Sequence, residues 1–173
     1  MRSYLIIILL TFAACTFQSN SKTTEIDLAN KNLSAIPDSI FSLTHLESLQ
    51  LGNNFTLYPP LSALGADKPE GENLNKIMKI PGSIKVLYKL RFLGMCFNDL
   101  KSLPSEIGEL RALDTLDLSF NEHLNIAAEF ETLKEMTWLK YLNVIATNTD
   151  TTTISKLRKA LLYTKIDATP EDL

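Results

Sequence analysis

The chain has 173 residues, which is long enough for one domain with a hydrophobic core. An apolar content of 45% and a mean hydropathy of +0.03 exclude a disordered chain. The formal net charge of −3 comes without a lysine- or arginine-rich run, so we expect no nucleic acid partner. Cys15 and Cys96 form neither a zinc pattern nor a CxxC pair, and their different contexts do not favour a disulfide.

Residues 1–14 indicate an export signal. Arg2 gives a positive start, and Tyr4 to Phe12 form an apolar run of nine residues. This run is shorter than the ~20 helical residues that cross a bilayer. Cleavage after Ala14 by the ordinary secretory route would place the bulky Phe12 where a small residue is preferred.

The sequence Phe12-Ala13-Ala14-Cys15 resembles the cleavage box of bacterial lipoproteins, with Phe12 in place of the usual leucine. The resemblance implies that Cys15 becomes the lipidated amino terminus and that a lipid is the only contact with the membrane. Thr16 differs from the aspartate that marks inner-membrane retention, so we expect an outer-membrane location. Residues 15–22 then form the lipidated cysteine and a tether. A soluble secreted protein with an incidental Cys15 is the alternative.

The stretch from Leu90 to Leu113 carries the pattern that organises the rest of the chain. Numbering the positions of one repeat as places, apolar residues fall at places 1, 4, 6, 11, 14, 18 and 21, which are Leu90, Leu93, Met95, Leu100, Leu103, Ile107 and Leu110. Asn98 lies at place 9, and Leu113 restarts the pattern 113 − 90 = 23 residues later. This period and spacing resemble the leucine-rich-repeat signature LxxLxLxxNxL.

The resemblance covers residues 23–166 and implies an α/β fold of about five or six repeats. The expected fold is a right-handed leucine-rich-repeat solenoid, with a parallel β-sheet on its concave face and short helices or turns on its convex face. It also implies that the asparagines at place 9 hydrogen-bond to backbone groups of neighbouring turns. Asn54, Asn98 and Asn121 are therefore predicted to be structural.

The repeats differ along the chain. The first starts at Thr23, with Lys31 at place 9, which suits an end repeat. The second starts at Leu46 and loosens over residues 55–80, where either a degenerate repeat or a loop of about twenty residues fits. After the repeats at Leu113 and Leu139, we expect a helix over 127–137, a capping helix over 153–163 with Thr153 as N-cap, an edge strand over 164–166 and a tail over 167–173.

No catalytic or cofactor motif appears, so we expect a non-enzyme without cofactors. His45 and His123 have no second ligand at metal spacing, and Cys96 has no base in reach. The acidic cluster Asp67, Glu70 and Glu72 lacks the pattern of a calcium loop. A hydrolase that uses this cluster is the least favoured alternative.

The predicted function is protein binding at the concave face. Side chains at places 3 and 5 point outward from a strand, while those at places 4 and 6 point into the core. The predicted contact patch, with Gly94 leaving a dip between neighbours, comprises Phe92, Asp114, Asp117 and Tyr141. The alternatives are a glycan or peptidoglycan binder and a surface with nothing attached. The sequence does not identify the partner.

Overall fold

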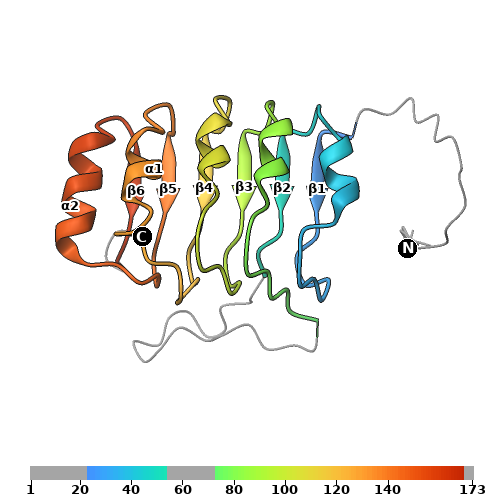
Figure 1. Cartoon of the computed structure of the whole chain (residues 1–173), viewed down its shortest axis with the longest axis horizontal. Helices are drawn as coiled ribbons and strands as arrows, with labels where there is room; N and C mark the ends of the chain where they lie inside the picture. Colours follow the sequence, from blue (N-terminus) through green and yellow to red (C-terminus); the bar gives the residue numbers. More distant parts are fainter. Residues whose placement is uncertain (1–22, 54–72, 170–173) are drawn as a thin grey trace, which may run out of the picture.

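In a computed structural model of the chain, which describes residues 23–53 and 73–169, one parallel sheet runs the length of the molecule (Figure 1). Each strand pairs with its neighbours in the sequence, in the order β1 to β6. The strands are β1 (Glu25–Asp27), β2 (Ser48–Gln50), β3 (Phe92–Gly94), β4 (Thr115–Asp117), β5 (Tyr141–Asn143) and β6 (Lys165–Asp167). This is the architecture that the 23-residue period predicts, an α/β solenoid of stacked coils.

The core is built from the same places in successive coils. The sheet register aligns the place 4 residues, so that Leu49, Leu93, Leu116 and Leu142 lie side by side with no exposed surface. Burial of each such leucine stabilises the fold by about 1.5–3 kcal/mol. No single coil buries these side chains alone, so the coils depend on one another for stability.

The return segments of the first three coils contain 3₁₀ helices, named η1 (Asp38–Ser42), η2 (Gly82–Val86) and η3 (Ser105–Glu109). Each follows a proline, and each buries one isoleucine, Ile40, Ile84 or Ile107. Proline suits the position before the first turn, where no intrahelical donor is needed. The fourth return contains α1 (Phe130–Lys134), which is shorter than the predicted 127–137 because residues 127–129 form turns.

The asparagine ladder is present, with one correction. Asn98 and Asn121 each accept a backbone N–H of the preceding coil and donate to backbone carbonyls of two coils. In the second coil these bonds are made by Asn75, which accepts from Leu33 N–H at 2.9 Å and donates to the carbonyls of Leu28 and Leu51 at 2.8 Å. Asn54, predicted for this role, lies outside the described residues.

The irregular region is an insertion within the second coil. Because β2 pairs directly with β3, no further strand lies between them in the described sheet, and residues 46–89, 90 − 46 = 44 in number, belong to one coil. Place 8 is Asn53 and place 9 is Asn75, so 75 − 53 − 1 = 21 residues are inserted. The two ends are joined by reciprocal bonds, from Asn75 N–H to Asn53 Oδ1 at 2.7 Å and from Asn53 Nδ2 to the Asn75 carbonyl at 2.9 Å.

The helix α2 (Thr151–Ala160) closes the end of the solenoid beyond β6 (Figure 1). It begins before Thr153, the predicted N-cap, because Asp150 Oδ1 accepts the Thr153 N–H at 2.9 Å. Ile154, Leu157 and Leu161 follow one another at helical spacing and are buried. Within the described residues, no helix is long and apolar enough to cross a membrane.

Candidate interaction surfaces

The concave face carries a row of half-buried side chains at place 3. The register sets Phe92 beside Thr115 and Thr115 beside Tyr141, on the neighbouring strands β3, β4 and β5. Since neighbouring strands lie about 4.8 Å apart, the two aromatic residues are about 10 Å apart with the small Thr115 between them. The sheet thus brings together Phe92 and Tyr141, which are 49 residues apart in sequence.

Asp114 belongs to a charged rim beside this row. Its carboxylate accepts from Arg91 Nη2 at 2.5 Å and lies 2.8 Å from Lys140 Nζ. These two hydrogen bonds, with the one from Lys140 the stronger influence, hold the pKa of Asp114 below its usual value. Because Arg91 and Lys140 are more than half exposed, these ion pairs contribute little to stability and leave both cations able to exchange partners.

Asp117 has a structural task that the sequence analysis did not assign to it. Its Oδ1 accepts from the N–H and the hydroxyl of Ser119, at 3.0 and 2.7 Å. Burial raises the pKa of this carboxyl group. The side chains of other place 5 residues also accept the backbone N–H two residues further on. Asp27 accepts from Ala29, Gln50 from Gly52 and Asn143 from Ile145. Place 5 is the last residue of each of these strands, and its side chain bonds to the turn that follows.

Tyr141 is held in place by the last strand. Its hydroxyl donates to Asp167 Oδ2 at 2.6 Å, and Lys165 Nζ lies 3.2 Å from the same oxygen. Burial and then this hydrogen bond raise the pKa of Tyr141. The phenol is neutral at physiological pH, and Lys165 Nζ also lies over its half-buried ring, 5.5 Å from the ring centroid.

Gly94 does not form the predicted dip. The residue is buried, and a Cβ at this position would collide with Gln50 Oε1 and contact the Phe92 ring. The side chain of Gln50 therefore lies where the dip was expected. A larger residue at this position would have to displace the end of the Gln50 side chain.

Cys96 is packed rather than reactive. Its Sγ lies against the backbone of Gly52 and 3.6 Å from the carbonyl oxygen of Asn53. Burial raises the pKa of the thiol to about 12. Because the thiolate is the nucleophilic form, this environment agrees with the expected inert thiol.

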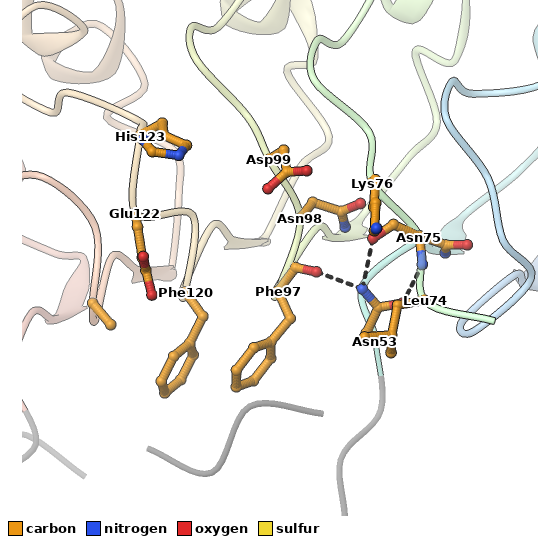
Figure 2. Close-up of a pocket in the computed structure, with 11 residues that line it drawn as sticks. Asn53, Leu74, Asn75, Lys76, Phe97, Asn98, Asp99, Phe120, Glu122 and His123 are labelled. Carbon is orange, nitrogen blue, oxygen red and sulfur yellow. Dashed lines mark hydrogen bonds between the residues drawn. The ribbon is translucent and has the colours of Figure 1, made fainter. Parts of the chain in front are cut away.

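A groove of about 360 Å³ lies along the turns that follow the strands (Figure 2). Phe97 and Phe120, both at place 8, stack in it with ring centroids 4.0 Å apart and an interplanar angle of 8°. Both residues have a left-handed backbone, with φ of 54° and 56°. The groove was not predicted from the sequence, although an aromatic residue directly before the asparagine in two consecutive repeats is a signal for it.

The groove is lined by titratable side chains, among them Glu122 and His123. His123 is exposed at its rim, near Glu122 (Figure 2). Among the residues that the structure describes, no group of three His, Cys, Asp or Glu side chains could hold a metal ion. His45 is half-exposed, and Asp67, Glu70 and most of the inserted segment lie outside the described residues.

Three solved structures show what the chain resembles. It is 18% identical to the leucine-rich-repeat ectodomain of the receptor kinase SOBIR1 from Arabidopsis thaliana, covering 83% of this chain and 68% of that chain at a TM-score of 0.53. It is 27% identical to an internalin (inlF) from Listeria monocytogenes, covering 84% of this chain but 47% of that one at 0.51. The plant peptide hormone receptor RGFR1, solved with RGF2, gives 24% identity over 84% and 24% of the two chains at 0.52.

These likenesses identify the fold as a leucine-rich-repeat solenoid. The chain spans less than half the length of the internalin and about a quarter of the hormone receptor. Comparison with protein-family models finds no match, and comparison with curated proteins finds none either. A shared fold of this kind carries many functions, so function has to be argued from the surfaces themselves.

Proposed function

We propose that the protein is a non-catalytic interaction module that binds a partner protein through the concave face of its solenoid. The observation that carries the proposal is the register that aligns Phe92, Thr115 and Tyr141 in one row. Two rings about 10 Å apart with a small residue between them leave room for one partner side chain. Aromatic anchors of this kind supply large contact areas at low entropic cost.

The surroundings of the row favour a polar rim around an apolar centre. Arg91, Asp114 and Lys140 lie along one side of the row, and the place 5 residues, including Asp117, along the other. In this proposal Asp114 exchanges its exposed cation partners for cations of the bound protein. Asp117 keeps its bonds to Ser119 and holds the strand end beside the row in place. Such an arrangement matches protein interfaces, in which a central anchor is enclosed by polar contacts.

We further propose that a lipid on Cys15 anchors the protein to the outer membrane of a bacterial envelope. The support is the box formed by Phe12 to Cys15 and the absence of aspartate at position 16. Residues 16–22 span at most about 25 Å when extended, at ~3.5 Å per residue. The solenoid would therefore work close to the membrane surface.

The binding proposal is tested by a crosslinking pull-down from envelope extract. The parent chain is run beside Phe92→Ser and Tyr141→Ser, with Tyr88→Ser as the matched control because Tyr88 is an exposed aromatic outside the row. A protein captured by the parent and by Tyr88→Ser, and lost from both row variants, is the expected result. Equal capture by all four chains would refute the concave site.

A variant that keeps the Tyr141 ring separates packing from hydrogen bonding. Tyr141→Phe removes the bond to Asp167 but retains the aromatic face, so capture should largely survive. The parent could instead capture no protein but be retained on peptidoglycan, while Tyr141→Ser is not retained. In that case the row binds a glycan. That outcome would replace the protein-binding proposal.

Lipid anchoring is tested separately by metabolic labelling with a fatty acid analogue. The parent should carry label and sediment with membranes, whereas Cys15→Ser should be unlabelled and soluble. Cys96→Ser is the control, because its half-buried thiol lies inside the solenoid, away from the lipoprotein box, and is not expected to be modified. Label that persists in Cys15→Ser would exclude this anchor.

A further inference from the structure

The first coil exposes apolar side chains that every interior coil buries. Ile26, Leu28, Leu33 and Leu43 occupy places 4, 6, 11 and 21 and are only partly buried. Their counterparts one coil further on, Leu49, Leu51, Ile77 and Leu87, have no exposed surface. The difference arises because a coil packs its apolar residues against both neighbours, and no coil precedes the first within the described residues.

The backbone at this end also carries hydrogen-bonding groups without a strand partner. Inside the sheet, the place 3 N–H donates to the place 2 carbonyl of the preceding coil, as Ser48 does to Thr24 at 2.9 Å. The place 5 carbonyl accepts from the place 6 N–H of the preceding coil, as Gln50 does from Leu28 at 2.8 Å. The equivalent groups of β1 are the N–H of Glu25 and the carbonyl of Asp27, and β1 is the outermost strand of the described sheet.

The opposite end of the solenoid is protected. The helix α2 lies beyond β6, and Arg158 Nη2 donates to the carbonyl of Ile166 at 3.2 Å. That carbonyl is at place 4, which faces the next coil wherever one exists. Arg158 of α2 thus satisfies one outward-facing carbonyl of the last strand, and the described residues show no equivalent contact at the outer edge of β1.

The charges of β1 indicate which kind of strand could pair with its outer edge. Glu25 and Asp27 are both exposed, at places 3 and 5. A second copy that paired antiparallel about Ile26 would place Glu25 opposite Asp27 of the other copy, and like charges in opposite positions are destabilising. Basic side chains in the same positions would form favourable cross-strand pairs.

We propose that the β1 edge is a second binding surface, which takes an extended segment of a partner protein as an additional strand. The segment carries basic residues that pair with Glu25 and Asp27 and, between them, an apolar residue that covers Ile26. Its backbone accepts the Glu25 N–H and donates to the Asp27 carbonyl, which continues the sheet. This surface is the outer edge of the sheet, two strands away from Phe92, and it does not depend on binding at the concave row.

The probe for this surface is a fluorescein-labelled peptide amide of sequence Gly-Thr-Lys-Ile-Arg-Leu-Thr-Gly, titrated into the full chain and followed by fluorescence anisotropy. One control peptide replaces lysine and arginine by glutamate, and another keeps the composition but groups the two basic residues. The basic alternating peptide should bind at least about tenfold more tightly than the acidic one, because two cross-strand pairs change sign.

Two variants of Glu25 separate charge from backbone pairing. Glu25→Gln removes the charge and should weaken peptide binding roughly two- to fivefold. Glu25→Pro also removes the N–H and should weaken it about tenfold or more, while the fold survives because proline is tolerated on edge strands. Glu135→Gln, an equal charge change at an exposed site on the α1 side, should leave binding unchanged. Thermal unfolding verifies that each variant is folded.

Several results would contradict the proposed edge site. Equal binding of the basic and acidic peptides, or full binding by Glu25→Pro, would overturn the proposal. Loss of peptide binding in Phe92→Ser and Tyr141→Ser, with none in Glu25→Pro, would assign the peptide to the concave row instead. A dimer detected by analytical ultracentrifugation and abolished by Glu25→Pro would assign the edge to a second copy.

Discussion

Each asparagine of the ladder connects coils that are distant in the sequence. Asn75 bonds to the Leu28 carbonyl, 47 residues away, and Asn121 to that of Met95, 26 residues away. These amides are buried, and the carbonyls of Leu51 and Met95 to which they bond belong to fully buried residues. An amide lost from such a site leaves several polar groups unpaired at once, so the ladder residues contribute more to stability than their size suggests.

The corrected ladder predicts different effects for Asn75 and Asn54. Asn75→Ala should lower the free energy of unfolding by at least ~2 kcal/mol, because the Leu33 N–H and the Leu51 carbonyl lose their partner. Asn54→Ala, the matched substitution at the position that residue counting selects, should change it by no more than about 0.5 kcal/mol. Denaturant unfolding of both variants decides the register, and the reverse order of effects would restore Asn54 to the ladder.

Asp117 should reveal its structural role through pH. Its pKa is raised in the folded protein, so the folded state binds the proton more tightly, and stability falls as pH rises from the unfolded pKa through the folded one. Asp117→Asn keeps an oxygen acceptor for the Ser119 N–H, as Asn143 does for Ile145, and it does not titrate. The variant should therefore be more stable than the parent at pH 7.

The measurement is chemical denaturation of the parent and Asp117→Asn across pH 4 to 7. The advantage of the variant should shrink as pH falls and the parent's carboxyl becomes protonated. Asp114→Asn is the opposite control, because its pKa is lowered and its carboxylate contributes stability that is lost on acidification. The assignment would be contradicted if the stability of Asp117→Asn, minus that of the parent, were smaller at pH 7 than at pH 4.

At the scale of elements, α2 shows how a cap is selected. The run from Asp150 to Thr153 contains four residues that can cap a helix, and the apolar spacing alone favours the one next to Ile154. In the structure, the Asp150 carboxylate reaches both the N–H and the hydroxyl of Thr153, at 2.9 and 2.8 Å. The helix consequently gains two residues at its start, and it ends at Ala160, so that Leu162 and Tyr163 lie outside it and are exposed.

The cap predicts a modest and position-specific loss of stability. Asp150→Ala should lower the Tm by about 2–4 °C, whereas Asp150→Ser should retain most of the stability because serine is also a strong N-cap. The pKa of Asp150 is lowered by these bonds, so its contribution is present at neutral pH and lost as pH falls through the folded pKa. A larger loss in Thr153→Val than in Asp150→Ala, measured by thermal unfolding, would favour Thr153 as the cap.

At the scale of the whole molecule, the insertion leaves the period of the solenoid intact. The second coil has 44 residues, and removal of 21 returns it to 23. Asn53 and Asn75 already bond to each other across the base of the insertion. The sheet, the ladder and the core on both sides therefore have the geometry of an uninterrupted repeat.

Deletion of residues 54–74 should consequently give a folded protein. We expect an unchanged circular dichroism spectrum in the strand region, one cooperative transition and a Tm within a few degrees of the parent, since loop length costs only ~0.6 kcal/mol per doubling. The deletion also removes one backbone bond, from Asn32 N–H to the Asn73 carbonyl. A broad or absent transition would show that the inserted residues belong to the core.

The sequence by itself determined the fold, the core and the candidate row. The repeat pattern places the buried leucines and the outward residues of the strands, because the alternation of side chains along a strand is local geometry. Phe92 and Tyr141 could be assigned to one face for the same reason. The prolines before the 3₁₀ helices and the apolar face of α2 are likewise local signals.

Only the tertiary structure decided which polar side chains already form hydrogen bonds or contacts with neighbouring coils. Asn75 replaces Asn54 because the ladder is defined by bonds between coils, and an insertion changes residue counts without changing those bonds. Gln50 covers Gly94, and Asp167 holds Tyr141, through contacts between strands that no local pattern encodes. The unequal ends of the solenoid follow from the same physics, since burial of a coil depends on whether a neighbour packs against it.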